Sequence, residues 1–381
     1  MARWWVLAAA VVTLAGCDSI FGSDDEDTGA VYTMNNNAAA NHVLIYARAE
    51  DGTLTRMDSI ATGGRGSGPD PVFGTDPLTS QDAVILSNDN RFLFVVNAGS
   101  NEISSFRVNG NGSLTLAGRV SSGGTFPVSL AQRGNLLYVV NANGGGNISG
   151  FTVGNDGSLT ALANSTRTLS GAAVPSPGSI RISPDSRVLI VTEKPTNLLD
   201  VYTLGTDGLA TAKTVVTSPG MTPFGADYDA SGNYILSEGH IGPNRMAVPD
   251  ASTVSSLDIS SAAGITASTV SAPTTETAAC WVQITDNGRF AYTTNTASGS
   301  ITGFAISAEG TLTRLTADGK TGVTGANTQP LDMAFADGYL YALTPGDGGI
   351  HVFKVNNDGS LTAQPGITGQ LPISVTGLAA Y

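Results

Sequence analysis

The chain has 381 residues, of which 41% are hydrophobic and 13% charged, and its formal net charge is −13. So acidic a chain repels phosphate backbones, which argues against nucleic acid as a partner. With 47 glycines, short β-branched runs and no segment of helical periodicity of useful length, the sequence predicts an all-β protein with a large core.

The first residues have the character of an export signal. Met1-Ala2-Arg3 is positively charged, Trp4 to Leu14 is apolar, and Leu14-Ala15-Gly16-Cys17 resembles the bacterial lipobox. This resemblance implies that residues 1–16 are a lipoprotein signal peptide and that Cys17 is lipidated, with residues 17–29 as a polar tether. The alternative is a cleaved secretory signal with an incidental cysteine. The lipobox predicts a bacterial envelope protein, lipid-anchored to a membrane, whose folded part lies in the periplasm or outside the cell.

From Ala30 onward the sequence is repetitive. An Asp-Gly or Asn-Gly turn followed by Leu-Thr, with drift, recurs about every 50 residues, and such turns supply the positive φ angles of a tight hairpin. The seven copies are Asp51–Thr55, Asn111–Thr115, Asp156–Thr160, Asp207–Leu209, Gly264–Thr266, Glu309–Thr313 and Asp358–Thr362.

Each repeat contains four strand signals. In the third repeat these are Pro127–Leu130, Asn135–Asn141, Ile148–Val153 and Leu159–Leu162. Seven repeats of four strands predict a seven-bladed β-propeller of antiparallel blades over residues 30–381. The first repeat lacks its own first strand, and Leu371–Thr376 is predicted to complete blade 1 and close the ring, which removes exposed sheet edges.

The two faces of this propeller differ in sequence. The Asp-Gly turns share the bottom face and are short and uniform. The connections on the top face are long and varied, and loops of that kind on a rigid scaffold more often carry function. They are residues 63–81, 168–177, 239–253 and 320–330.

A ring of polar residues is predicted at the top, where the second strand of each blade ends. It consists of Asn35, Asn97, Asn141, Glu193, Glu238, Asn295 and Thr344. The asparagines either line the mouth as substrate-binding groups or cap the strands by bonding nearby backbone. Glu193 and Glu238, in adjacent blades, are candidate catalytic carboxylates that would raise each other's pKa. A salt bridge of Glu193 with Lys194 or Arg181 is the alternative.

The segment Ser237-Glu238-Gly239-His240 opens the longest insertion. Glu238 and His240 are two residues apart and are expected to point to the same side, so either is a candidate general base. Arg245, Arg181 and Lys194 are candidate substrate-binding groups, unless the loop merely orders itself. Trp281 either lines the mouth or belongs to the core. Cys280, in an apolar strand, is interpreted as a small buried residue. No motif for a metal or a cofactor is present, and none is expected.

A family resemblance rests on Ile182–Leu189 and Ile284–Tyr292 together with the Asp-Gly-Ser-Leu-Thr turns. These segments resemble the lactonase-type seven-bladed propellers, which include bacterial 6-phosphogluconolactonases and carboxymuconate lactonising enzymes. The resemblance places the family's catalytic histidine near Pro177-Gly178 and its two arginines at Phe224 and around Thr277-Ala278, so those residue types are not retained. Only the family's glutamate has a counterpart, Glu238, or His240 if the register shifts by two.

Two functions are compatible with these patterns. The first is a lactonase-like envelope lipoprotein that binds and hydrolyses an uncharged or weakly charged lactone or ester, with Glu238 or His240 activating water. The second is a non-catalytic propeller that binds an envelope protein or glycan through the top loops. A monomer is expected in either case.

Overall fold

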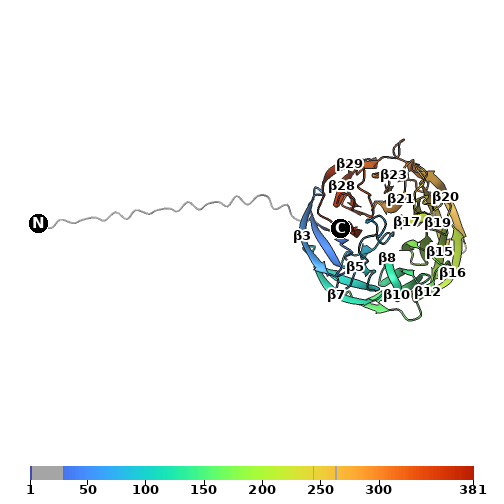
Figure 1. Cartoon of the computed structure of the whole chain (residues 1–381), viewed down its shortest axis with the longest axis horizontal. Coiled ribbons are helices and arrows are strands. Elements are labelled where there is room, and N and C mark those ends of the chain that lie inside the picture. Colours follow the sequence, from blue (N-terminus) through green and yellow to red (C-terminus); the bar gives the residue numbers. More distant parts are fainter. Residues whose placement is uncertain (2–28, 243, 262–263) are drawn as a thin grey trace.

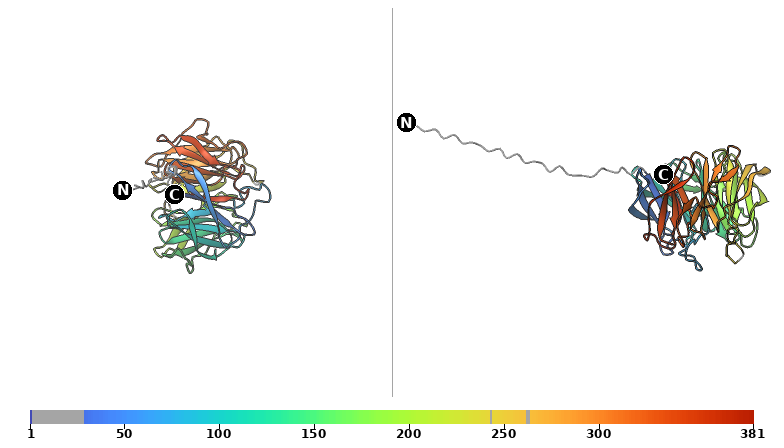
Figure 2. Two further views of the ribbon diagram at one scale, coloured as in Figure 1. Left: turned by 90° about the vertical axis from the view of Figure 1, so that its left-hand side faces the viewer. Right: turned by 90° about the horizontal axis from the view of Figure 1, so that it is seen from above.

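The computed structural model describes residue 1 and residues 29–242, 244–261 and 264–381, which form seven antiparallel sheets arranged as the blades of a ring (Figures 1 and 2). The predicted seven-bladed propeller is therefore confirmed. The described residues contain strands and connecting segments but no helix long and apolar enough to cross a membrane. Residues 2–28, including Cys17 and the predicted signal peptide, lie outside the described part of the chain.

The blades follow one another in chain order. Blade 1 contains β1 (Gly29–Met34), β2 (His42–Arg48), β3 (Leu54–Ala61) and β30 (Thr376–Ala380). Blade 2 contains β4 (Val84–Leu86), β5 (Phe92–Asn97), β6 (Glu102–Val108) and β7 (Leu114–Ser121). Blade 3 contains β8 (Thr125–Arg133), β9 (Leu136–Asn143), β10 (Asn147–Val153), β11 (Leu159–Ala161) and β12 (Arg167–Thr168). Blade 4 contains β13 (Pro177–Ile182), β14 (Val188–Glu193), β15 (Leu198–Leu204) and β16 (Ala210–Thr217).

The remaining blades have the same plan. Blade 5 contains β17 (Pro223–Tyr228), β18 (Asn233–Glu238), β19 (Thr253–Ser261) and β20 (Gly264–Pro273). Blade 6 contains β21 (Ala279–Ile284), β22 (Phe290–Asn295), β23 (Ser300–Ile306), β24 (Leu312–Arg314) and β25 (Gly322–Val323). Blade 7 contains β26 (Met333–Ala336), β27 (Tyr339–Thr344), β28 (Gly349–Val355) and β29 (Leu361–Ile367). The innermost strands β30, β4, β8, β13, β17, β21 and β26 contact one another in this order around the axis.

The C-terminal strand closes the ring as predicted, but it lies further along the chain. β30 pairs with β1 from Thr376 onward, where the sequence predicted a strand over Leu371–Thr376. Pro372 instead begins a turn, in which the Val375 N–H donates to the Pro372 carbonyl at 3.0 Å. A proline cannot donate to a sheet ladder, so pairing starts only after this turn.

The Asp-Gly turns join the third and fourth strands of the blades and also contact the neighbouring blade. The hydroxyl of a second-strand tyrosine donates to the carbonyl of the turn glycine in the next blade at four places: Tyr32 to Gly112 (2.7 Å), Tyr138 to Gly208 (2.8 Å), Tyr292 to Gly359 (2.8 Å) and Tyr341 to Gly52 (3.2 Å). In blade 3, Gly157 has φ +86°, and a Cβ there would lie 2.7 Å from the Phe92 ring of blade 2. Glycine is therefore required both by the turn and by this contact.

The central channel is filled by a segment of the chain itself, Ser80–Asp82. The Gln81 backbone N–H donates to Gly178 of blade 4, and its side-chain amide donates to Ala226 of blade 5 and to Val282 of blade 6. The Gln81 Oε1 accepts from the Val282 N–H at 3.0 Å. One buried residue thus connects the innermost strands of three blades and closes the channel below the top face.

We expect Gln81→Ala to lower the free energy of unfolding by about 3 kcal/mol, because the Val282 carbonyl and N–H lose their bonds to the Gln81 side chain and the Ala226 carbonyl keeps only its bond from Arg181. Equilibrium denaturation in guanidinium chloride measures this. Gln364→Ala is the matched control, since its amide makes one 3.4 Å bond on the outer strand β29, and its effect should stay within about 0.5 kcal/mol. Equal effects of the two substitutions would show that the channel segment does not stabilise the ring.

Candidate active site

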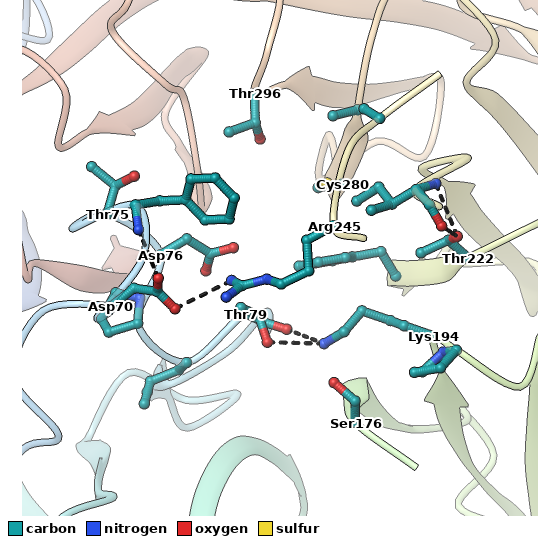
Figure 3. A pocket seen from close by; sticks show the side chains of 18 of the residues that line it. Asp70, Thr75, Asp76, Thr79, Ser176, Lys194, Thr222, Arg245, Cys280 and Thr296 are labelled. Carbon is teal, nitrogen blue, oxygen red and sulfur yellow. Dashed lines mark hydrogen bonds and ion pairs between the residues drawn. The ribbon is translucent and has the colours of Figure 1, made fainter. Parts of the chain in front are cut away.

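A cavity of about 860 Å³ opens at the top face, above the channel segment. All four long top connections contribute to its wall, as the sequence predicted for the functional face: residues 70–79, 174–177, 241–247 and 327–329. The remainder of the wall comes from the ends of inner and second strands, with Phe126, Lys194, Phe224, Cys280 and Thr296 among them (Figure 3). We call this space the top cavity.

Asp76 is one of the two carboxylates that line the top cavity. Its backbone has φ 51°, and its Oδ1 is buried with no hydrogen-bond partner among the described residues. Burial raises the pKa of Asp76 to about 7, although the charges of Lys194 and Arg245 and the Thr79 N–H oppose the increase. Such a carboxyl group changes its protonation state near neutral pH, which is the property of a general acid or base.

Arg245 reaches into the cavity from the insertion after β18. A bridge between Ile241 and Ala247 and a bond from the Arg245 N–H to the Gly242 carbonyl at 2.9 Å form a tight hairpin that holds it. Its Nη2 lies 3.2 Å from Asp70 Oδ2, and its guanidinium lies 4.8 Å from the Phe73 ring centre. In Figure 3 the guanidinium points toward Asp70 and Asp76 from the opposite wall.

Lys194 is a fixed charge in the wall. Its ammonium donates to the carbonyl and hydroxyl of Thr79 and to the Pro177 carbonyl, and it lies 4.8 Å from the Phe224 ring centre. Desolvation lowers the pKa of Lys194 to about 8, while the nearby Asp76 opposes that change. Because an ammonium has three N–H groups, these bonds use all of its donors. Burial also raises the pKa of the Cys280 thiol, so this cysteine stays protonated, as expected for a small buried residue.

Comparison with known proteins identifies the family. Residues 24–175 and 243–368 match the family model described as "Lactonase, 7-bladed beta-propeller". The chain belongs to this lactonase family. No curated protein matches it.

Solved structures have the same fold at low identity. A candidate 6-phosphogluconolactonase from Bacteroides uniformis superposes with a TM-score of 0.69 at 18% identity over 92% of this chain and 99% of its own. A second candidate 6-phosphogluconolactonase, from Bacteroides fragilis, gives 0.65 at 18% identity over 92% and 98%. The periplasmic gluconolactonase PpgL of Pseudomonas aeruginosa also gives 0.65 at 18% identity, over 92% and 99%.

In this lactonase-family protein the two glutamates predicted from the sequence, Glu193 and Glu238, are not among the residues that line the top cavity. Glu238 is buried and accepts hydrogen bonds from the Gly220 N–H and from the hydroxyls of Thr253, Ser255 and Ser271. Glu193 accepts from the Ser170 N–H and hydroxyl and from Thr196, so it makes no salt bridge with Lys194 or Arg181. The two glutamates therefore bond within their own surroundings and do not face each other across the mouth.

His240 is likewise not in the cavity wall. Its backbone has φ 48°, and its Nε2 lies 3.4 Å from the Thr253 hydroxyl, which also donates to Glu238. His240 and Glu238 are thus brought near one another through Thr253, behind the wall rather than within it. A catalytic role for Glu238, His240 or Glu193 stays a prediction.

The other predicted residues divide into cavity and structural groups. Lys194 and Arg245 line the top cavity, whereas Arg181 pairs on the axis with Asp82 at 2.8 Å and lies 3.8 Å from Asp227. Trp281 is a core residue, because it is 1% exposed, packs on Phe224 and donates its indole N–H to the Ser80 carbonyl.

Three of the ring asparagines hydrogen-bond inside the blades and are not among the residues that line the cavity. Asn97, Asn141 and Asn295 are fully buried and bond to neighbouring strands, for example Asn97 Nδ2 to Ser104 at 2.8 Å and Asn295 Nδ2 to Thr302 at 2.9 Å. The residues that reach the cavity come one position later, at Ala142, Lys194 and Thr296. The residues after these, Asn143, Pro195 and Ala297, line it as well, so the cavity begins beyond the last residue of the predicted ring.

Asp76 was not among the predicted site residues. It lies in the long connection 63–81, which was predicted to be functional, but the carboxylate was not singled out because nothing in the local sequence shows that the loop folds back onto the axis. Within residues 29–242, 244–261 and 264–381, no three His, Cys, Asp or Glu side chains group as metal ligands.

A second buried carboxyl group, Asp200, lies beside Glu193 behind the cavity wall. Its pKa is raised to about 7, chiefly by burial and next by the charge of Glu193, while Lys213, 3.9 Å away, opposes this. The folded state therefore holds a proton that the unfolded chain has lost above its ordinary pKa of 3.8.

The contribution of Asp200 to the free energy of unfolding is present at low pH and is lost as the pH rises from about 4 to about 7. In that range the folded state binds more protons than the unfolded state. We expect Asp200→Asn, which carries no titrating proton, to make the unfolding free energy fall less steeply with pH across this window. Urea denaturation at pH 4.5, 5.5, 6.5 and 7.5 measures the slope. The exposed Asp258→Asn should leave it unchanged, and identical slopes for Asp200→Asn and the wild type would contradict the assignment.

Proposed function

We propose that this propeller hydrolyses a lactone in the top cavity and that Asp76 is the general base. The observation that carries the proposal is the buried, unpartnered Oδ1 of Asp76 in the wall of a cavity large enough for a small ligand. Membership of the lactonase family and the names of the similar structures, which include gluconolactonase and 6-phosphogluconolactonase, support a lactone as the class of substrate.

The reaction is a water-dependent ring opening. The ionised Asp76 accepts a proton from water while the water oxygen forms a bond to the lactone carbonyl carbon. The resulting tetrahedral intermediate collapses when the bond between this carbon and the ring oxygen breaks. Asp76 then returns the proton to the leaving oxygen, so the product is a hydroxy acid and the carboxylate is regenerated.

The cations of the site have separate tasks in this scheme. The Nη2 of Arg245 donates a hydrogen bond to Asp70. The guanidinium has further N–H donors that can stabilise the oxyanion of the intermediate. All three N–H donors of Lys194 bond to Thr79 and Pro177, so Lys194 does not bind the substrate. Its positive charge opposes the rise in the pKa of Asp76. A substrate would thus be held between Asp76 and Arg245.

Turnover should depend on Asp76. We expect Asp76→Asn to lower kcat about 10²- to 10⁴-fold, because an amide cannot accept the proton from water. For the wild type, kcat/KM should fall about tenfold per pH unit below pH 7 and level off above it, because only the ionised form of a group with a pKa of about 7 acts as a base. A pH-stat assay with glucono-δ-lactone and δ-decalactone, corrected for spontaneous hydrolysis, measures both.

Asp258→Asn is the matched control, since Asp258 is exposed on β19. The same assay separates Asp76 from the base predicted by sequence. If Glu238→Gln combined with His240→Ala abolishes turnover with the fold intact while Asp76→Asn retains it, the base is the sequence-predicted pair and our assignment is wrong.

We also propose that the protein acts in the bacterial envelope, lipid-anchored through Cys17. The lipobox resemblance of Leu14–Cys17 supports this, and one protein of the same fold is named a periplasmic gluconolactonase. Cys17 itself lies outside the described residues.

In a bacterial host, we expect the wild-type chain to sediment with membranes and to incorporate an alkyne-tagged palmitate, since a thioether-linked diacylglycerol requires the Cys17 thiol. Cys17→Ser should lose the label and leave the membrane pellet. Unlabelled but exported wild-type protein would instead support a cleaved secretory signal with an incidental cysteine.

A further inference from the structure

One side of the top cavity is apolar. The connections of blades 3, 4 and 5 contribute Phe126, Val174, Met221, Phe224, Ile241 and Met246 to its wall. Pro177, Phe224 and Ala278, where the family resemblance would place a histidine and two arginines, also lie in the wall and present no charge. These residues offer contact surface to a ligand, and the two cations that arise from the same blades, Lys194 and Arg245, are already bonded to Thr79, Pro177 and Asp70.

The charged residues of the wall balance in sign, and both cations already interact with protein groups. They are two carboxylates, Asp70 and Asp76, and two cations, Lys194 and Arg245. Lys194 donates all three of its N–H groups to the protein, and Arg245 is paired with Asp70. A phosphate group requires several charge-assisted donors. The wall supplies no excess positive charge for one.

The apolar side continues out to the rim. Val174 is 69% exposed, Met221 51% and Met246 61%, although each lines the cavity. Single exposed apolar residues are ordinary, but three that line one cavity give a ligand apolar surface to cover. Methionine side chains also adapt to irregular apolar shapes.

From these observations we infer that the substrate is an uncharged lactone with an apolar substituent of several carbons. The ring would lie between Asp76 and Arg245, and the substituent would extend over Phe224, Met221, Val174 and Met246 toward the rim. This inference rests on the proposed lactone hydrolysis but is a statement about binding. Each buried methylene should improve affinity about fourfold.

Binding is tested with ketones, which have no ring ester bond and cannot be hydrolysed. Isothermal titration calorimetry of the purified protein compares 2-pentylcyclopentanone, cyclopentanone and 6-phosphogluconate. We expect burial of three or four of the five pentyl carbons to improve affinity on the order of 100-fold over cyclopentanone, with a negative heat-capacity change, the marker of apolar burial. We expect 6-phosphogluconate to bind more weakly than the pentyl ketone.

Val174→Ser tests the location of the chain. It should weaken binding of 2-pentylcyclopentanone several-fold and leave binding of cyclopentanone unchanged. The matched control Val270→Ser removes an equally exposed valine, 62% exposed on the outer strand β20, and should change neither. Both sites are exposed, so folding is preserved.

The inference is overturned if the pentyl chain gives no gain, if no ketone binds, or if 6-phosphogluconate binds more tightly than the pentyl ketone. Failure of the proposed function has a different signature. In that case the pentyl gain and the Val174→Ser loss are observed, while δ-decalactone is not hydrolysed or Asp76→Asn leaves its hydrolysis unchanged.

Discussion

The site depends on the hydrogen bonds of one buried amide. Gln81 bonds to the innermost strands of blades 4, 5 and 6, and Trp281 holds the adjacent Ser80 carbonyl. These contacts close the central channel and turn the top of the ring into a cavity with a floor. They also fix the preceding loop, which carries Asp70, Asp76 and Thr79, so the carboxylates and the partner of Lys194 are positioned by the same segment.

The placement of charge in the cavity follows from this arrangement. Burial raises the pKa of Asp76, but Lys194 and Arg245 lie close enough to oppose complete neutralisation, so the carboxyl group is held near the midpoint of its titration at neutral pH. Arg245 stays in place because the hairpin around Gly242 and the pair with Asp70 orient it. The polar groups of the site are therefore preorganised, and apolar residues from the connections of blades 3 to 5 line the cavity beside them.

The repeated turns have a wider structural role than their sequence indicates. As hairpin turns they satisfy local geometry, but the glycine carbonyls also accept hydrogen bonds from tyrosines of the preceding blades, as in Tyr138 to Gly208. The turn glycines also pack on an aromatic ring of the preceding blade, as Gly157 does on Phe92. The bottom face is thus devoted to holding blades together, which leaves the top connections free to vary.

The sequence alone determined the number of blades, the order of strands, the closure by the C-terminus and the face on which a cavity forms, because all of these follow from hairpin turns and strand periodicity that repeat along the chain. It did not determine which side chains enter the cavity. Glu193 and Asn295 precede the residues that line the cavity, Lys194 and Thr296, because a pattern cannot fix the end of a strand to a single residue. The role of Asp76 could not be predicted from the sequence for a different reason. It becomes a buried acid only because Gln81 carries its loop to the axis, and that contact joins residues about 100 to 200 positions apart, which no local pattern records.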